Sequence, residues 1–170
     1  RYSEGYGLSI NGIDYAKKNK CSLIIVLDCG IKAVSQVEYA NEKKIDTIIC
    51  DHHTPGEILP NASAVLNPKQ KDCNYPFKDL SACGVGFKLV QAYSEKNNIP
   101  FNSIKPFFDL LAISIVADIV PLTGENRIFT YYGIKQLNNN PSIGLKSLIS
   151  LMKKSNAISV SDIGFFLAPR

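Results

Sequence analysis

Residues 23–53, LIIVLDCGIKAVSQVEYANEKKIDTIICDHH, contain the pattern that decides the fold. Residues 23–28, LIIVLD, form a short, continuous and β-branched run that is apolar up to its last residue, which is typical of a parallel strand buried on both faces. Apolar residues then recur at helical spacing over 34–40, and a second apolar run follows over 47–50. This order of strand, helix and strand predicts a βαβ unit with a right-handed crossover, and hence an α/β fold.

Downstream of this unit, we expect the chain to add one strand and then become mostly helical. Residues 64–66 form a third short apolar run between a loop over 54–60 and a turn-rich segment over 69–81. Helical spacing recurs over 84–95, and residues 107–120 are apolar nearly all round, which predicts a buried central helix. Two amphipathic helices should follow, with apolar positions at Ile128, Tyr131, Ile134 and Leu137 and at Leu145, Leu148, Ile149 and Met152. The predicted fold is a parallel sheet flanked by helices, followed by a mostly helical lobe.

The composition is that of a globular protein of one domain, or of one and a half small ones. The chain has 170 residues, of which 45% are hydrophobic and 20% charged, and this excludes a disordered or fibrous chain. No apolar run reaches the ~18–20 residues that a membrane span needs, and no secretory signal opens the chain. The net charge of +4 is compatible with a polyanionic partner but does not by itself indicate one.

The cysteines and the chain ends indicate where the protein works and how much of it is present. The five cysteines form no CxxC pair, which favours a reduced, cytoplasmic protein over one with a structural zinc site. The sequence begins at Arg1 rather than Met, and it stops at Arg170 directly after the apolar residues 163–169. We therefore expect a piece of a longer protein.

Acidic residues end two neighbouring strands of the predicted sheet. Asp28 closes the first strand and Asp51 closes the second. Because ligands bind at the carboxyl edge of an open parallel sheet, the two carboxylates should converge at one crevice. The alternative is that each aspartate only caps the helix that follows it.

Histidines beside one of these acids favour metal or phosphate chemistry. The chain has two histidines, His52 and His53, and both follow Asp51 directly. In tandem, one can coordinate a metal while the other faces a substrate phosphate. Carboxylate and imidazole ligands suit Mn²⁺ better than a structural zinc. Asp118, which closes the apolar run 112–117, is a further candidate, because a charge there is costly unless it is paired or bound to a cation; the alternative is an interior helix cap.

Several blocks of sequence carry a resemblance to a known family. LDCG, DHH and VADIVPL, at residues 27–30, 51–53 and 116–122, resemble motifs of the DHH phosphoesterase superfamily. Within it the chain is similar to the RecJ-like single-strand-specific DNA exonucleases. The blocks that carry this second resemblance are EGYGLS (4–9), DHHTPGEILPNASAVLNPKQ (51–70), CNYPFKDLSACGVGFKL (73–89), PLTGENR (121–127) and FFLAPR (165–170).

The resemblance implies roles for five acids and histidines. Asp28, His52 and Asp118 match metal ligands of the family, with Asp28 placed to bridge two ions. His53 matches a residue that contacts the phosphate during catalysis, and Asp51 one that supports the histidines. The implied cofactor is Mn²⁺ or Mg²⁺, with two ions in the complete enzyme.

Three further residues match positions that bind the nucleic-acid strand. The resemblance implies that Arg1 and Tyr6 grip the 5′ end and that Arg170 begins a phosphate-binding segment; the alternative for Arg1 is a solvated chain end. The Gly84–Gly86 pair is expected to form a tight entry into a helix and to offer backbone N–H groups to a phosphate. The basic run Lys17, Lys18 and Lys20 is most often a solvated helix end.

The implied function is that of a metal-dependent, single-stranded-DNA-specific 5′-to-3′ exonuclease in the bacterial cytoplasm. Its partners would be single-stranded DNA and other proteins of DNA repair and recombination, with no membrane. Residues 1–170 include neither the family's first motif, Asp-x-Asp, nor the DHH-associated and oligonucleotide-binding domains that the resemblance implies. We therefore expect residues 1–170 to be a partial DHH domain that is inactive by itself. The alternatives are a DHH phosphoesterase of short oligonucleotides or cyclic dinucleotides, and a non-catalytic nucleic-acid-binding relative.

Overall fold

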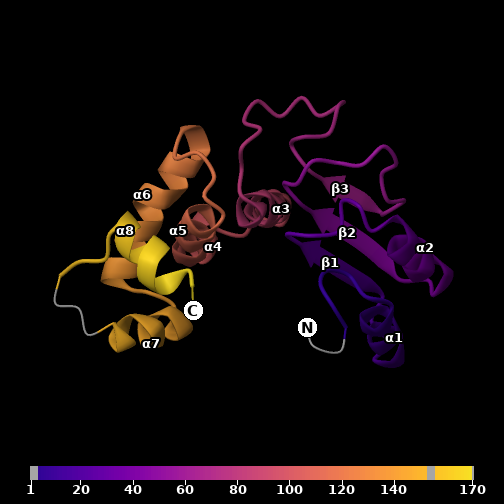
Figure 1. The fold of residues 1–170 in the computed structure, drawn as a ribbon, viewed down its shortest axis with the longest axis horizontal. Helices are drawn as coiled ribbons and strands as arrows, with labels where there is room; N and C mark the ends of the chain where they lie inside the picture. The colour runs from indigo at the N-terminus through magenta and orange to yellow at the C-terminus, as the bar shows by residue number, and fades with distance from the viewer. Residues whose placement is uncertain (1–3, 153–155, 170) are drawn as a thin grey trace. The chain divides into compact units, whose positions relative to one another are not determined.

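The computed structural model describes residues 4–152 and 156–169, and the chain divides into two compact units (Figure 1). Arg1–Lys78 contains the sheet, and Asp79–Arg170 is helical in its described part. This division confirms the predicted order of a parallel sheet with helices followed by a helical lobe. No helix in the described part of the chain has both the length and the hydropathy to cross a membrane.

The first unit is a three-stranded parallel sheet with two helices. Its elements in chain order are α1 (Ile10–Lys18), β1 (Leu23–Leu27), α2 (Val34–Glu42), β2 (Asp46–Cys50) and β3 (Ala64–Leu66). The strand order is β1-β2-β3, and both pairings are parallel. Because the register places Leu27 beside Cys50 and Cys50 beside Leu66, the three strands end together at one edge.

The turn after β1 depends on backbone conformations that few residues adopt. Asp28 has a φ of +63° and Gly30 a φ of +102°. A Cβ on Gly30 would lie 2.9 Å from Cγ1 of Val26, so only glycine fits there without a shift of the strand. The turn leads into α2, which buries Val37 against Val26 and Ile49 of the sheet.

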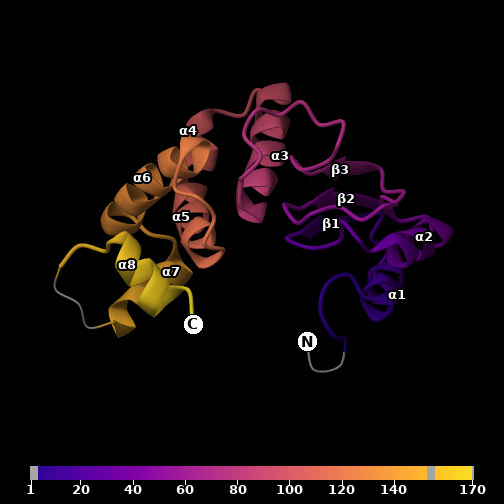
Figure 2. The ribbon, with the colours of Figure 1, turned by 45° about the horizontal axis from the view of Figure 1, so that its top comes forward.

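The prediction that the first strand is buried on both faces is wrong. Val26 is buried, whereas Leu23, Ile25 and Leu27 are 43%, 50% and 55% exposed. The reason is that β1 lies at an edge of the described sheet, and that α1 and α2 both pack on the face that carries Ile24 and Val26 (Figure 2). The residues of β1 therefore alternate between buried and exposed positions although the strand is apolar throughout.

The second unit consists of helices. They are α3 (Ala82–Lys96), α4 (Phe101–Ile104), the 3₁₀ turn η1 (Lys105–Phe107), α5 (Phe108–Ala117), α6 (Gly124–Asn139), α7 (Ile143–Leu151), α8 (Val160–Asp162) and the π-helical turn η2 (Ile163–Leu167). One core cluster joins Ala112, Leu137, Leu145 and Ile163. A second contact region is aromatic, with Phe87 packed edge-to-face on the rings of its neighbours in α5 and α6.

Three expectations for this unit need correction. The helix predicted from residue 84 begins at Ala82, because Ser81 caps it, so Gly84 lies inside the helix rather than in a loop before it. The N–H of Gly84 donates to Oγ of Ser81 at 3.1 Å, so it is not available to a phosphate. The predicted central helix over 107–120 is α5, which ends at Ala117 and leaves Leu110 45% exposed rather than buried all round.

The predicted buried face of α6 is also wrong in part. Ile128 and Tyr131 are 53% and 55% exposed, whereas Phe129, Gly133 and Leu137 are buried. The close approach of α5 determines which face of α6 is buried, since a Cβ on Gly133 would lie only 2.2 Å from a backbone oxygen of α5.

Candidate metal centre

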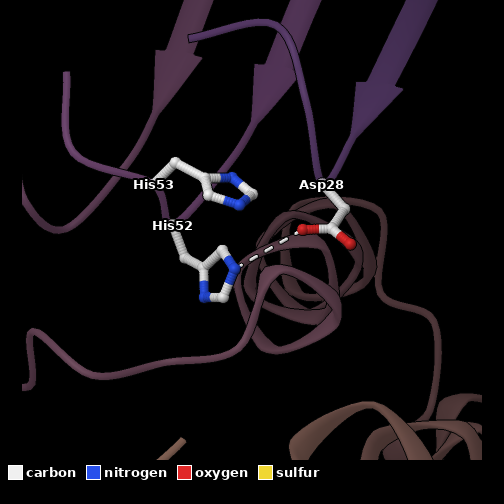
Figure 3. A group of neighbouring side chains, drawn as sticks. All are labelled: Asp28, His52 and His53. Atoms are coloured by element: carbon white, nitrogen blue, oxygen red, sulfur yellow. Dashed lines mark ion pairs between the residues drawn. The ribbon is translucent and has the colours of Figure 1, made fainter. Parts of the chain in front are cut away.

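The first two strands bring an acid and two histidines to one edge of the sheet. Asp28 directly follows β1, and Asp51, His52 and His53 directly follow β2, as Figure 3 shows for Asp28 and the two histidines. The N–H of Asp28 donates to the carbonyl of Cys50 at 3.0 Å, which continues the pairing of the strands beyond the end of β1. The predicted convergence of the strand-end residues is therefore present within the first unit.

Three side chains in this group offer donor atoms to one point. Nε2 of His52 lies 3.5 Å from Oδ1 of Asp28, and the two imidazole rings meet edge-to-face at a centroid distance of 4.7 Å. One ligand atom of each of Asp28, His52 and His53 lies within 4.8 Å of the others. A mixed carboxylate and imidazole set of this kind suits Mn²⁺ and related divalent ions. The chemistry of these residues thus fits the predicted metal.

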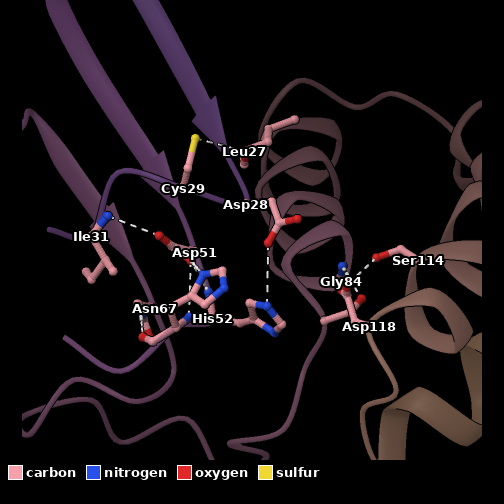
Figure 4. Close-up of polar contacts among 12 residues, drawn as sticks. Leu27, Asp28, Cys29, Ile31, Asp51, His52, Asn67, Gly84, Ser114 and Asp118 are labelled. Atoms are coloured by element: carbon pink, nitrogen blue, oxygen red, sulfur yellow. Dashed lines mark hydrogen bonds and ion pairs between the residues drawn. The ribbon is translucent and has the colours of Figure 1, made fainter. Parts of the chain in front are cut away.

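Asp51 holds the turn that carries both histidines. Its side chain is 1% exposed, and its carboxylate accepts three backbone N–H groups (Figure 4). Oδ2 accepts from Ile31 at 3.0 Å, and Oδ1 accepts from His52 at 2.8 Å and from His53 at 3.1 Å. Burial by itself would raise the pKa of Asp51, but these donors and the His53 ring lower it below its usual value. Asp51 therefore stays ionised, and its hydrogen bonds link the turn that contains residues 51–53 to the turn after β1.

The same carboxylate orients His53. Nδ1 of His53 lies 2.7 Å from Oδ1 of Asp51, and because an ionised carboxylate only accepts, Nδ1 is the ring nitrogen that donates. The His53 ring is 57% exposed and the His52 ring only 12%, so His53 is the histidine that solvent or a substrate reaches. This geometry suits either a metal ligand or a group that contacts a phosphate.

Asn67 is a residue of this edge that the analysis of the sequence did not single out. It directly follows β3 and is 3% exposed, and its Nδ2 donates to the carbonyl of His53 at 2.8 Å. Its own Oδ1 accepts the N–H of Lys69. The signal in the sequence was its position at the end of the third apolar run, where a polar residue reaches the same edge as the two aspartates.

Two thiols near the carboxylates are poor metal ligands. Burial, followed by the charge of Asp51, raises the pKa of Cys50 to about 11. Burial also raises the pKa of Cys29, with Asp51 and Asp28 adding to it. Both thiols therefore stay protonated at neutral pH in the metal-free chain, and the donor atoms that converge at the sheet edge are those of carboxylate and imidazole.

Asp118 lies in the second unit, at the C-terminal end of α5. It is the C-cap residue of that helix, and its Oδ2 accepts a hydrogen bond from Oγ of Ser114 at 3.3 Å (Figure 4). Its role as a metal ligand stays a prediction.

The residues predicted to bind the strand are only partly described. Tyr6 is 77% exposed in the segment before α1, and its contact with a 5′ end stays a prediction. Arg1 and Arg170 lie outside the described residues. Lys17 and Lys18 occupy the last turn of α1, which confirms that this basic run is a helix end.

Comparisons with known proteins identify relatives of this chain. The profile of the DHH family, N-terminal domain, matches residues 6–115. Over the whole chain, the single-stranded-DNA-specific exonuclease RecJ of Escherichia coli K12 is 36% identical, and that of Bacillus subtilis 168 is 41% identical. A crystal structure of exonuclease RecJ bound to manganese superposes with a TM-score of 0.84 at 27% identity, over 99% of this chain and 42% of the other.

These relatives are longer than this chain. The chain spans 31% of the length of the E. coli protein and 21% of that of the B. subtilis protein. The family profile nevertheless covers well over half of the chain and includes every residue of the cluster at the sheet edge. The chain therefore belongs to the DHH family.

Proposed function

We propose that this chain is part of the catalytic DHH domain of a RecJ-like enzyme, which hydrolyses single-stranded DNA from the 5′ end. The observation that carries the proposal is the cluster of Asp28, His52 and His53, held at the sheet edge by the buried carboxylate of Asp51. It is supported by the similarity to proteins named single-stranded-DNA-specific exonucleases. The proposal includes a role in DNA repair and recombination, in the bacterial cytoplasm, with single-stranded DNA and other repair proteins as partners.

The side chains divide the work between them. Asp28 and His52 would hold a divalent ion, Mn²⁺ or Mg²⁺, and we propose Asp118 as a further ligand. When bound, such ions supply Lewis-acid activation of a water and of the scissile phosphate. His53 presents Nε2 to the phosphate, while Asp51 keeps the proton on Nδ1 and fixes the plane of the ring.

We propose that residues 1–170 do not form a complete active centre. Three ligand side chains meet at the sheet edge in the described part of the first unit, which is too few to hold two ions. Because much of the rate in metal-assisted hydrolysis comes from positioning, an incomplete centre should lose nearly all of it. We expect the isolated chain to bind one Mn²⁺ weakly and to degrade no single-stranded DNA.

Two measurements test the proposal. In the whole protein, His52→Ala should abolish the release of nucleotides from 5′-ended single-stranded DNA, while Asp72→Asn, at an exposed position, should not. In the isolated chain, titration calorimetry with Mn²⁺ should show weak binding that Asp28→Asn removes. Near-normal turnover of the His52→Ala protein under saturating Mn²⁺ would contradict the assignment of the ligands.

A further inference from the structure

A cavity of about 450 Å³ lies within the second unit, among α3, α4, η1, α5 and α6. Its floor consists of three buried phenylalanines, Phe87, Phe108 and Phe129, whose rings meet edge-to-face at centroid distances of 5.3 to 5.8 Å. Such contacts fix the orientation of the rings. The floor is therefore a rigid aromatic surface, and it shares no residue with the metal centre.

Two further aromatic rings stand at the rim of the cavity. Phe101 and Tyr132 each meet Phe108 edge-to-face, at 6.1 and 6.3 Å, and they are 52% and 50% exposed. Each of these residues thus stays about half exposed although its ring contacts Phe108. Rings held in this way can take up a planar aromatic group with little loss of side-chain freedom.

The polar lining is cationic and amide-bearing. Lys88 and Lys105 line the cavity, and none of its lining residues is acidic. The Lys88 ammonium pairs with Glu125 and lies 5.3 Å from the centre of the Phe129 ring, whereas Lys105 is exposed at the start of η1. Three amide side chains, Gln91, Asn102 and Gln136, complete the lining. An occupant should therefore be planar and aromatic, carry negative charge near Lys105, and have an edge that both donates and accepts hydrogen bonds.

We propose that this cavity binds one unstacked base of a single-stranded nucleic acid, with a neighbouring phosphate near Lys105. Bases stack on aromatic side chains in sequence-tolerant single-strand sites, and cations beside them follow the backbone. Amide side chains can bond the edge of a base whichever donors and acceptors it presents. This proposal depends on the proposed function in one respect only: the proposed function identifies the single-stranded nucleic acid as DNA.

Binding of a fluorescein-labelled oligothymidylate to the 170-residue chain, followed by fluorescence anisotropy in EDTA, tests this site without the metal centre. Phe101→Ala should weaken binding about tenfold, because one base loses its stacking partner. Phe107→Ala is the matched control, since Phe107 is 46% exposed on the neighbouring turn and does not line the cavity. Lys105→Gln should lower the slope of log affinity against log salt by about 0.7, and Lys96→Gln, at an exposed position of α3, should not.

Thermal unfolding of each variant by circular dichroism shows whether it folds, and Lys105→Gln gives a second readout that requires no aromatic side chain to be removed. Equal affinities for the Phe101→Ala and Phe107→Ala chains would overturn the proposal. So would binding of an acidic peptide, but not of the oligonucleotide, in a way that depends on Phe101. If the whole protein fails to hydrolyse DNA while oligonucleotide affinity still depends on Phe101, the proposed function falls and this site stands.

Discussion

Replacement of Asp51 by asparagine isolates the contribution of one carboxylate to the candidate centre. The two side chains have the same shape, but asparagine has one acceptor oxygen and one amide that only donates. In the structure both oxygens of Asp51 face donors: Oδ1 accepts from His52 and His53, and Oδ2 from Ile31. Whichever way the amide is turned, it must therefore place a donor against a donor.

The less damaging orientation sets the magnitude of the effect. With the amide toward Ile31, one hydrogen bond to a charged acceptor is lost, and a buried N–H is left without a partner. A bond of that kind contributes about 1.5–3 kcal/mol, and the remaining bonds weaken because their acceptor is no longer charged. We expect Asp51→Asn to lower the free energy of unfolding by about 2–4 kcal/mol.

Urea denaturation of the isolated chain in EDTA, followed by circular dichroism, measures this loss without a metal contribution. Asp72→Asn, at an exposed position, is the control and should change the free energy of unfolding by less than about 0.5 kcal/mol. An Asp51→Asn chain as stable as this control would refute the reasoning, because it would show that the turn does not depend on the charged acceptor.

The dependence on pH gives a second check. The fold lowers the pKa of Asp51, so the stability that its ionisation supplies is present above the pKa of an unfolded aspartate. It is lost as the pH falls through the lowered value. The difference in the free energy of unfolding between the unaltered chain and Asp51→Asn should therefore shrink in acid. A difference that stays constant from neutral to acidic pH would mean that the charge of Asp51 contributes nothing.

Three other outcomes can be measured. Gly133→Ala should lower the free energy of unfolding by about 2 kcal/mol or more, because the new Cβ would collide with the backbone of α5. Gly144→Ala is the control: a Cβ there would have nothing within 4 Å, so this change should leave the free energy of unfolding unaltered or raise it by up to about 1 kcal/mol. Urea denaturation of the two variants measures both effects. Iodoacetamide should alkylate the exposed Cys21 in the native chain and reach Cys50, whose pKa is about 11, only after unfolding, as peptide mass spectrometry would show. In the whole protein, Tyr6→Ala should weaken binding of 5′-ended strands by about 1–3 kcal/mol, and unchanged kinetics on such strands would indicate that Tyr6 only packs its loop.

The sheet and its polar edge could be predicted because each depends on signals that are local in the sequence. Short β-branched runs separated by a helical repeat specify a parallel unit, and the strand-end position of Asp28 and Asp51 then follows from topology. The tasks of the individual side chains could not be obtained in this way. For example, the carboxylate of Asp51 accepts a hydrogen bond from the N–H of Ile31, 20 residues earlier in the chain. This bond depends on how the two turns meet in space, and neither segment of sequence contains a pattern that indicates it.

The helical unit shows why hydropathy alone misplaced part of the buried face of α6. The predicted face included Ile128 and Tyr131, but the observed one is centred on Gly133, where α5 approaches too closely for any side chain. A polar residue, Asn126, is fully buried on α6, because its amide donates to the carbonyls of Asp79 and Pro121 and so fastens the segments that precede two helices.

One of the apolar residues wrongly predicted to be buried on α6 lies beside a cavity instead. Ile128 lines the aromatic cavity, together with Tyr132 of the same helix and Phe101 from the preceding part of the unit. Close contact between α5 and α6 therefore uses small residues, and it leaves larger ones half exposed around a cavity of about 450 Å³. Aromatic side chains in such a position stabilise the fold less than fully buried ones would. Their exposed faces are instead available to a partner, which is the arrangement that a site for an unstacked base requires.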